Sequence, residues 1–575
     1  MFDVLVVGGG VTGTGAALDA ATRGLRVALI EARDYAAGAS SKSSKLIHGG
    51  LRYLEMLDFA LVREALTERG LLLTRLAPHL VKPVPFLWPL THRLWERPYV
   101  GAGLLLYDTL GGRRAVPRAR HFSRNGALRL APALRPDALV GAVQFHDAQE
   151  DDARMVACIA RTAAAHGAAM ATRVEMTRAL VRDGRVIGVH ARDLLAGTDL
   201  EIRARHVAQA TGAWTAGPGG SQAPAGEPAG ADQPGLRVRP SKGVHIVVPR
   251  DRIAMDTGLL ARTSESVLFV IPWGRHWVIG DTDTEWPFDP GLPAASRADI
   301  DYLLAKVNAL LREPLTADDI EGVFAGLRPL VAAGADTDTT KLSREHSIRS
   351  PLPGLSVIAG GKYTTYRVMA RDLIDVAARD LAASPGWQRG EVPASRTDQV
   401  PLAGADGYAA MWSARREIAE AAGLPDAQVE RLLGRYGSDV ALLTDAMAAR
   451  PELAEPLPGS GGYLGAEVTF ACTNEGALGL DDVLARRTRV TIETRDRGAA
   501  AAPHAARLMA GALGWDEART AAEVAGYLEM IAAELAAESM PDDLTAYRAR
   551  ARASRPAASR PAGGSVAEEP VGSEN

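Results

Sequence analysis

The stretch Val4-Leu5-Val6-Val7-Gly8-Gly9-Gly10-Val11-Thr12-Gly13 decides the fold of this chain. Its first four residues are apolar and mostly β-branched, which predicts a short buried strand that meets Gly8. A helical pattern of small residues runs from Val11 to Arg23, and residues 25–30 predict a second buried strand that ends at Glu31. This order of strand, glycine-rich turn, helix and strand is typical of the start of a parallel α/β sheet.

The glycine pattern and Glu31 together predict a dinucleotide site. Gly8 permits the tight turn, Gly10 lets a pyrophosphate approach the helix N-terminus, and Gly13 allows close helix packing. Glu31 would accept a hydrogen bond from a ribose 2′-hydroxyl, and its charge would repel the extra phosphate of NADP. A glycine-rich turn without a ligand has the same local pattern, but the flanking strands and Glu31 favour the dinucleotide.

The segment that follows favours FAD over NAD. An NAD-binding domain normally continues with further strand and helix units, whereas here residues 39–45 (ASSKSSK) lead directly into residues 46–53 (LIHGGLRY). Serine hydroxyls can donate hydrogen bonds to phosphates, and small residues let a flat ring lie against the backbone. A plain polar surface loop would not require the Gly-Gly pair between His48 and Arg52.

The composition excludes several classes of protein. The chain has 575 residues, 47% of them hydrophobic and 23% charged, so it is long enough for several domains and is not disordered as a whole. Its net charge of −4 supplies no global reason to bind nucleic acid. Cys158 and Cys472 are too few for a disulfide framework or a metal cluster. We therefore expect a cytosolic protein that holds no metal.

Later segments follow four patterns. Residues 203–210 and 355–359 are apolar runs that enter glycine-containing turns, as expected of further parallel strands. From residue 397 onward, apolar residues recur at helical spacing. Residues 216–235 are rich in Gly, Pro and Ala and predict a mobile loop. Short apolar runs set off by Pro and Gly predict an antiparallel sheet, and these are residues 244–248, 267–271 and 277–279.

Several segments, taken together with the glycine motif, closely resemble the FAD-dependent glycerol-3-phosphate dehydrogenases of the aerobic, respiratory type. The order and spacing of these segments hold from residue 1 to about residue 545. The segments are residues 40–55 (SSKSSKLIHGGLRYLE), 241–249 (SKGVHIVVP), 326–330 (GLRPL), 343–346 (SREH), 360–367 (GGKYTTYR), 474–477 (NEGA) and 484–489 (LARRTR).

The resemblance implies an α/β fold like that of the amino-acid oxidases. A glutathione-reductase-type FAD-binding domain would interleave with an antiparallel-sheet substrate domain inside residues 1–396. The FAD-binding parts would be about residues 1–80, 140–240 and 330–396, and the substrate-domain parts about residues 81–139 and 241–329. A mainly helical C-terminal domain would span residues 397–545, before a disordered tail at residues 546–575.

The resemblance also implies that the substrate is glycerol 3-phosphate. Its phosphate needs fixed cations, and the planar fork of arginine suits bidentate phosphate recognition. The matched segments nominate Arg52, Arg328, Arg344 and Lys362 for this role. Tyr53 would hydrogen-bond the substrate or shape the flavin face.

Two histidines are candidates for the proton acceptor. The hydroxyl proton of the substrate must leave as the hydride departs, and a neutral histidine is the simplest acceptor near pH 7. His245 and His48 both lie in matched segments, and the sequence does not separate them. His346 would mainly position Arg344. Arg328 could instead stabilise a developing alkoxide.

The glycine motif and the resemblance nominate residues that hold FAD without a covalent bond. Backbone N–H groups of residues 360–365 would approach the end of the flavin where negative charge develops on reduction. Lys362 would serve either that charge or the phosphate. The candidates are Gly8, Gly10, Thr12, Gly13, Glu31, Ser40, Ser41, Ser44, Lys45, His48, Gly49, Thr211, Gly212, Gly361, Lys362, Thr364 and Thr365.

One apolar region bears on the electron acceptor. Residues 83–90 (PVPFLWPL) are followed by Trp95 and by an apolar run at residues 100–107, with arginines between them. A segment packed in the core has this composition too, but it also suits a surface that dips into an anionic membrane. No run reaches the ~18 apolar residues needed to span a bilayer. Because the resemblance is to a respiratory enzyme, we predict a peripheral protein on the cytoplasmic face of the cell membrane that reduces a membrane quinone.

Three other functions remain open from the sequence. An oxidase would pass electrons from the flavin to oxygen and form hydrogen peroxide. Another member of the amino-acid oxidase superfamily would act on an amine, although the four cationic candidates speak against it. A flavin-binding sensor would perform no turnover at all. A homodimer is compatible with the sequence.

Overall fold

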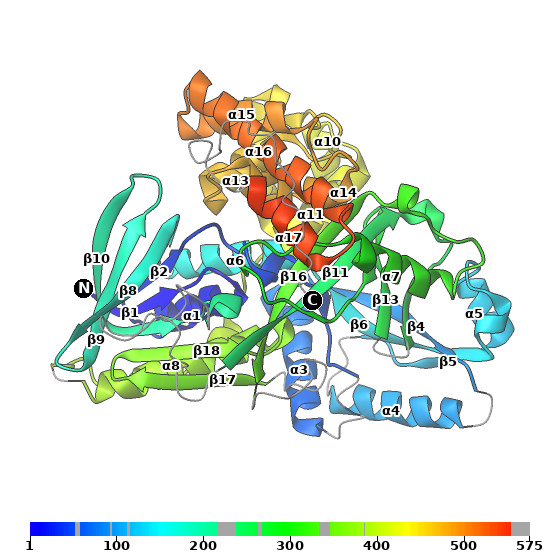
Figure 1. Ribbon diagram of the computed structural model, residues 1–575, viewed down its shortest axis with the longest axis horizontal. Coiled ribbons are helices and arrows are strands. Elements are labelled where there is room, and N and C mark those ends of the chain that lie inside the picture. Colours follow the sequence, from blue (N-terminus) through cyan, green and yellow to red (C-terminus); the bar gives the residue numbers. More distant parts are fainter. Residues whose placement is uncertain are drawn as a thin grey trace, which may run out of the picture.

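The computed structural model describes residues 1–51, 54, 58–92, 95–111, 116–215, 237–262, 267–332, 345–384 and 386–553. In these residues the chain forms two sheets and a C-terminal layer of helices (Figure 1). The predicted site residues Arg52, Tyr53 and Arg344 lie outside the described residues, as do the predicted loop at residues 216–235 and residues 554–575 of the predicted tail.

The first sheet is built around the predicted N-terminal unit. β1 (Phe2–Val7) and β2 (Val27–Glu31) are parallel neighbours joined by α1 (Val11–Thr22). β1 lies in the middle of the sheet because it is apolar on both faces and is covered on both. The order across the sheet is β17 (His346–Leu352), β18 (Leu355–Gly360), β10 (Thr198–Gln209), β1, β2 and β7 (Ala169–Thr172), with β8 (Val174–Arg182) and β9 (Arg185–Asp193) added antiparallel beside β10.

α1 packs between α6 (Asp152–Ala165) and α8 (Tyr366–Ala382) against this sheet. The small residues of α1 permit the close approach. A Cβ atom at Gly15 would lie only 3.0 Å from the ring of Tyr366 in α8. The sequence pattern of small residues therefore sets the distance between these helices.

The second sheet is mostly antiparallel, as predicted. Its strands β11, β13 and β14 contain the three predicted apolar runs. The order across the sheet is β15 (Thr284–Glu285), β11 (Arg237–Pro249), β14 (His276–Gly280), β13 (Val267–Trp273), β12 (Gly258–Arg262), β4 (Lys82–Leu90), β6 (Gly141–Gln149) and β3 (Leu46–Ile47), with β16 (Gly322–Ala332) paired to β11 and β5 (Arg120–Ser123) paired to β6.

Helices cover the second sheet on both sides. α7 (Arg297–Asn308) and α5 (Arg124–Leu130) share one apolar core with β11 and β14. α4 (Glu96–Leu110) buries Val100 and Leu104 in the other core, and α3 (Phe59–Leu71) packs beside it. The apolar run predicted at residues 100–107 is therefore part of one helix, which buries Val100, Leu104 and Tyr107.

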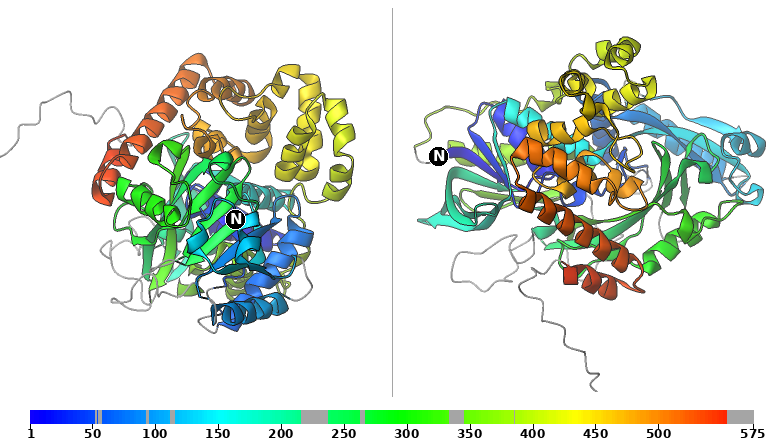
Figure 2. Two further views of the ribbon diagram at one scale, coloured as in Figure 1. Left: turned by 90° about the vertical axis from the view of Figure 1, so that its right-hand side faces the viewer. Right: turned by 90° about the horizontal axis from the view of Figure 1, so that it is seen from above.

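The C-terminal residues are helical, as predicted, and form a layer over the two sheets (Figure 2). Buried ion pairs join this layer to the first sheet. Arg154 Nη2 lies 2.5 Å from Glu475, and Arg487 donates two 2.7 Å hydrogen bonds to Asp34. The helices are α9 (Tyr408–Ser413), α10 (Arg415–Ala422), α11 (Asp426–Tyr436), α12 (Val440–Ala449), α13 (Gly465–Glu475), α14 (Val490–Glu493), α15 (Ala502–Leu513), α16 (Glu517–Glu538) and α17 (Asp543–Ala553).

Two predicted boundaries are wrong. The FAD-binding part predicted at residues 140–240 includes β6, yet β6 pairs with β4 along its whole length and shares a core with Trp88. The predicted disordered tail includes residues 546–553, but these residues form the greater part of α17. This helix is ordered because Ala546 is fully buried and Arg550 pairs with Glu534 of α16.

Candidate active site

A cavity of about 1510 Å³ lies where the two sheets meet. The first sheet contributes the ends of β1, β10 and β18, while the second contributes β4, β12, β13 and β16. Parallel strands of this kind bind ligands beyond their carboxyl ends, where the connecting turns meet. The volume exceeds the roughly 300–1,000 Å³ of a site for one drug-sized ligand, so it can hold a dinucleotide and a second small molecule.

The glycine-rich turn after β1 is sterically determined. Gly8 has a φ of +114°, and a Cβ atom there would lie 2.5 Å from the carbonyl oxygen of Ala210. A Cβ atom at Gly13 would lie 1.9 Å from the Gly8 carbonyl oxygen. The turn therefore brings the N-terminus of α1 to the cavity wall with bare backbone, as an approaching pyrophosphate requires.

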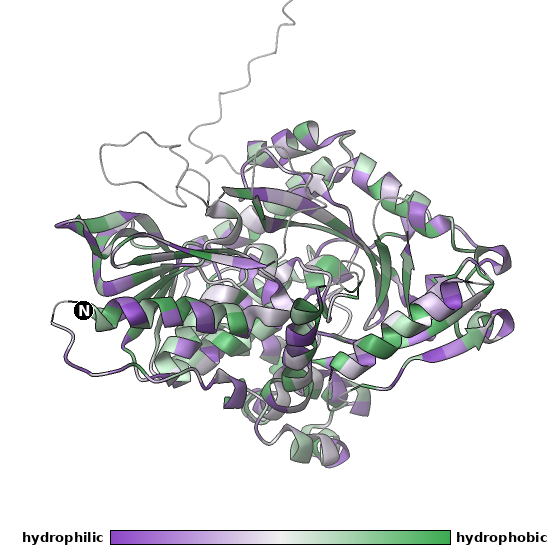
Figure 3. Ribbon diagram, turned by 90° about the horizontal axis from the view of Figure 1, so that it is seen from below, coloured by the Kyte–Doolittle hydropathy of each residue, from purple (hydrophilic) through white to green (hydrophobic). Residues whose placement is uncertain are grey.

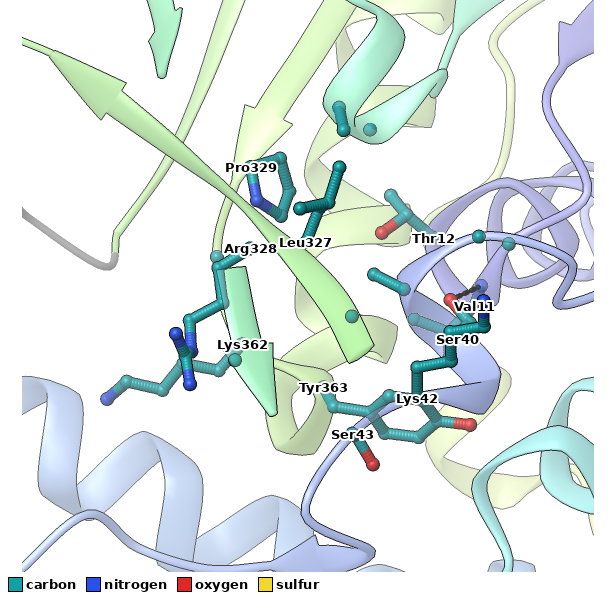
Figure 4. A pocket seen from close by; sticks show the side chains of 18 of the residues that line it. Val11, Thr12, Ser40, Lys42, Ser43, Leu327, Arg328, Pro329, Lys362 and Tyr363 are labelled. Atoms are coloured by element: carbon teal, nitrogen blue, oxygen red, sulfur yellow. Dashed lines mark hydrogen bonds between the residues drawn. The ribbon is translucent and has the colours of Figure 1, made fainter. Parts of the chain in front are cut away.

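Ser40 completes this end of the cavity. The N–H of Val11, at the start of α1, donates a 3.0 Å hydrogen bond to Ser40 Oγ (Figure 4). Because Ser40 accepts this bond, its own hydroxyl hydrogen is left to donate to a phosphate oxygen.

Glu31 lies in the cavity wall and is held by the backbone. Its Oε2 accepts from the N–H of Gly9 at 2.6 Å, and its Oε1 accepts from the N–H of Arg33 at 2.8 Å. Burial raises the pKa of this carboxyl, and the two N–H groups oppose that shift. Each carboxylate oxygen has a second lone pair, so the group keeps the capacity to accept from ribose hydroxyls. These features together fit an FAD molecule bound through its adenosine and pyrophosphate.

His245 lines the cavity from β11, in the second sheet. Its ring stacks on Phe324 at a centroid distance of 4.8 Å and an angle of 8°, and its Nε2 is 2.9 Å from Ser44 Oγ. Nδ1 has no hydrogen-bond partner among the described residues. Burial lowers the pKa of His245 to about 4, so the ring is neutral at pH 7.

His48 also lines the cavity, and its backbone is tied to the turn after β18. Its N–H donates to Thr364 Oγ1 at 3.1 Å, and the hydroxyl of Thr364 donates to the His48 carbonyl at 3.2 Å. Gly360 and Gly361 adopt φ values of +79° and +87°, which turn the chain from β18 towards His48. Two matched segments that are distant in the sequence are thereby joined.

Arg328 and Lys362 supply positive charge at one side of the cavity. Figure 4 shows both side chains away from the Val11 and Ser40 end. Arg328 pairs with Asp281, donates to the Thr282 carbonyl at 3.0 Å and to Ser241 Oγ at 3.3 Å, and lies 3.6 Å from Asp283. The carboxylates hold the guanidinium in one orientation while partly neutralising it.

Some predicted residues lie behind the cavity wall rather than in it. Lys45 is fully buried, and its Nζ donates to Asp152 at 2.9 Å and to the Ser41 carbonyl at 2.9 Å. Gly49 donates its N–H to the hydroxyl of Tyr107 at 2.7 Å. These groups fix the shape of residues 41–49 and leave Ser40, Ser44 and His48 to face the cavity.

The predicted residues divide into two sets by position. The residues that line the cavity are Gly8, Gly10, Thr12, Glu31, Ser40, Ser44, His48, Thr211, Gly212, His245, Arg328, Gly361, Lys362 and Thr364. The predicted residues that pack behind the wall are Gly13, Ser41, Lys45, Gly49 and Thr365.

Sequence reasoning missed the carboxylates around Arg328. Asp281 and Asp283 follow directly after β14, at the end of a predicted strand, which is where polar site residues gather. It also missed Phe324, the stacking partner of His245, which lies four residues before Arg328 on β16. Period-two spacing on a strand places both residues on one face.

Comparison with known proteins supports the same assignment. The family described as FAD dependent oxidoreductase matches residues 3–376, and the C-terminal domain of alpha-glycerophosphate oxidase matches residues 395–520. Glycerol-3-phosphate dehydrogenase 2 of Mycobacterium tuberculosis is 52% identical over 553 residues, covering 96% of this chain and 92% of that protein. The mitochondrial glycerol-3-phosphate dehydrogenase of Homo sapiens is 35% identical over 569 residues, covering 95% of this chain and 75% of that protein.

A solved structure has the same architecture. The glycerol-3-phosphate dehydrogenase of Bacillus halodurans, complexed with FAD, superposes with a TM-score of 0.73 at 28% identity, covering 94% of this chain and 96% of that one. The chain therefore belongs to the glycerol-3-phosphate dehydrogenase family of FAD-dependent oxidoreductases.

Proposed function

We propose that this chain oxidises sn-glycerol 3-phosphate to dihydroxyacetone phosphate by hydride transfer to FAD, and that the electrons pass to a membrane quinone. One arrangement carries the proposal. A neutral histidine and two cationic side chains line the same cavity as the dinucleotide-binding turn. The names of the relatives at 52% and 35% identity support glycerol 3-phosphate as the substrate.

The cationic residues would bind the phosphate of the substrate. Arg328 offers a planar set of N–H donors from within β16, and Lys362 offers a second charge from the turn after β18. A phosphate carries nearly two negative charges, so it can share Arg328 with Asp281. The surrounding polar groups already hold Arg328 in place, and little side-chain freedom would be lost on binding.

His245 is our candidate for the proton acceptor. FAD, when bound, supplies the hydride acceptor, and the protein must take the hydroxyl proton of the substrate. The low pKa keeps His245 neutral, and its Nδ1 contacts no other acceptor or donor in the described chain. Stacking on Phe324 and the contact with Ser44 fix the plane of the ring. Arg328, which lies close enough to influence the pKa of His245, would stabilise negative charge on the substrate oxygen.

Replacement of Arg328 tests the phosphate site. Arg328→Ala should raise the KM for glycerol 3-phosphate by about 10- to 150-fold, because a charge-assisted hydrogen bond contributes ~1.5 to 3 kcal/mol. Glycerol lacks the phosphate, so it should be a poor substrate for the unaltered enzyme. The turnover of glycerol should fall little further in Arg328→Ala. Arg135→Ala, at an exposed surface pair, is the matched control. Equal turnover of glycerol and its phosphate ester would rule out a phosphate site.

The quinone part of the proposal rests on an apolar sector of the cavity wall. A polar substrate does not need this surface, whereas a quinone ring does. Arg262 lies over the ring of Trp88 at 5.7 Å, which adds one cation to the sector. The apolar lining residues are Leu51, Phe86, Trp88, Phe145, Leu260, Val267 and Phe269.

α4 links this sector to the molecular surface. Val100 and Leu104 pack in the same core as Phe86, while Trp95, Tyr99, Leu105 and Leu106 are exposed by 55%, 51%, 66% and 38%. Figure 3 views the molecule from the side on which α4 lies and shows hydrophobic residues along this helix. Residues 83–90 lie in β4, which is largely buried, so they are not available for the predicted membrane contact. Within this region we propose that α4 makes the contact.

We therefore place α4 against an anionic membrane on the cytoplasmic face of the cell. None of the helices in the described residues is long and apolar enough to cross a bilayer. Leu105→Glu should reduce flotation with anionic liposomes and slow electron transfer to a long-chain quinone, because a charge on the apolar face opposes insertion. Leu195→Glu is the matched control, since Leu195 is 63% exposed on the turn after β9.

The same measurement separates the acceptors. Activity with a short-chain quinone in the absence of oxygen should be unaffected by Leu105→Glu. Rapid stoichiometric peroxide formation with no response to quinone or lipid would make the chain an oxidase. Absence of flavin bleaching with glycerol 3-phosphate would make it a binding protein.

A further inference from the structure

α17 lies beyond the end of the C-terminal family-model match, and it reaches the cavity. The C-terminal family match ends at residue 520, whereas α17 spans Asp543–Ala553. Figure 1 shows α17 crossing over β11 and β16. Tyr547, on this helix, is one of the residues that line the cavity.

The ring of Tyr547 is part of an ordered aromatic cluster. It stacks on Phe288 at a centroid distance of 4.9 Å and an angle of 9°, and Phe288 meets Trp286 edge to face at 5.1 Å. Phe288 also lines the cavity. Ala546 is fully buried against the same cluster, together with Ala213 and Leu327.

These neighbours place Tyr547 beside the dinucleotide part of the cavity. Ala213 follows Thr211 and Gly212 at the end of β10, next to the glycine-rich turn of β1. Aromatic rings at such a position exclude water and contact a flat or apolar part of a ligand. α17 thus supplies a wall that the two sheets leave incomplete.

A buried lysine anchors the start of α17. Lys242 is fully buried on β11, and its Nζ donates to Asp299 at 2.6 Å and to Asp543 of α17. Ser296 Oγ also donates to the carboxylate of Asp543, at 3.1 Å. A buried ammonium needs both charges, so Asp543 cannot leave without cost.

The anchor also touches the cationic side of the cavity. Lys242 lies between Ser241 and Gly243, which pair with Arg328 and Gly326 across the β11 and β16 ladder. Ser241 Oγ accepts from Arg328. The ion pairs of Lys242 with Asp299 and Asp543 therefore fix β11, the strand whose Ser241 helps to orient Arg328.

We propose that α17 is part of the FAD site: Tyr547 closes the cavity wall over the bound dinucleotide, and the pair of Lys242 and Asp543 holds the helix in this position. The proposal concerns retention of FAD and does not depend on the substrate or the electron acceptor.

The rate of FAD release from the full-length holoenzyme tests the proposal. Release is followed by the rise in flavin fluorescence after dilution. Tyr547→Ala should release FAD about tenfold faster, because both the stacked ring and the closed wall are lost. Tyr547→Phe keeps the ring and should release FAD at nearly the rate of the unaltered protein. Leu544→Ala, at an exposed position of the same helix, should also release FAD at nearly the rate of the unaltered protein.

A second variant tests the anchor with the ring in place. Asp543→Asn should release FAD about threefold faster, since Lys242 then keeps only Asp299 as a charged partner among the described residues. The urea midpoint of each apoprotein is measured in parallel. Faster release in both variants, with an apoprotein midpoint of Tyr547→Ala like that of Leu544→Ala, supports the proposal. Release rates of both variants within twofold of the unaltered protein would overturn it.

Discussion

His245→Asn should slow reduction of the flavin by glycerol 3-phosphate by about 100- to 10,000-fold, the usual contribution of general-base catalysis. FAD binding should be unchanged, because His245 lies on β11 of the second sheet, whereas the glycine-rich turn follows β1 of the first sheet. Anaerobic stopped-flow mixing measures the reduction rate directly, and the flavin absorbance of the purified variant reports its FAD content.

The pH dependence of reduction gives the sign of the effect. Burial lowers the pKa of His245 to about 4, so the neutral, proton-accepting form dominates above that pH and is lost as the pH falls through it. The acidic limb of the rate should therefore lie well below the ordinary histidine value of about 6.5, and His245→Asn should abolish it. His48→Asn is the companion variant. If the acidic limb disappears in His48→Asn and persists in His245→Asn, His48 is the base.

Asp34→Asn should cost about 3 to 5 kcal/mol of stability, the usual result of removing one partner of a buried ion pair. Asp34 is fully buried and accepts two hydrogen bonds from Arg487 at 2.7 Å and one from Arg486 at 2.6 Å. Among the described residues, Arg486 would keep Asp481 and Asp482 as charged partners, but Arg487 would keep only Glu475, at 3.9 Å. The variant should lower the urea midpoint of the holoenzyme.

The control is Asp137→Asn, at an exposed pair with Arg135, which should change stability by no more than about 1 kcal/mol. Burial alone would raise the pKa of Asp34, but Arg487 and Arg486 outweigh it and hold the pKa at about 2. The contribution of Asp34 is therefore complete above about pH 4 and is lost as the pH falls towards 2. Equal midpoints for Asp34→Asn and Asp137→Asn would mean that this buried contact does not stabilise the protein.

The C-terminal motif acquires a physical meaning from these contacts. Residues 484–489 resemble the family motif, but the sequence pattern does not explain their three arginines. Arg486 and Arg487 bind Asp34, and Arg489 binds Asp151 and Asp152. Asp152 in turn holds Lys45 behind the cavity wall. The helical layer thus supports the serine-rich segment through charges that no local pattern connects.

The sequence by itself determined the parts of the protein that depend on a few neighbouring residues. The run from Val4 to Gly13 defines β1, the turn and α1, because apolar periodicity and the steric demands of glycine act locally. Matched segments identified the family and named His48, His245, Arg328 and Lys362, and all four line one cavity.

The tertiary structure alone decided which of these groups face the cavity and what each one pairs with. Ser40 and Ser44 face it while Ser41 and Lys45 do not, because the buried charge of Asp152 draws the backbone of this segment inward. The β6 pairing and the place of α17 were likewise missed. Strand pairing and buried ion pairs depend on complementary surfaces whose residues lie tens to hundreds of positions apart in the sequence. The local composition around one residue therefore does not predict its partner.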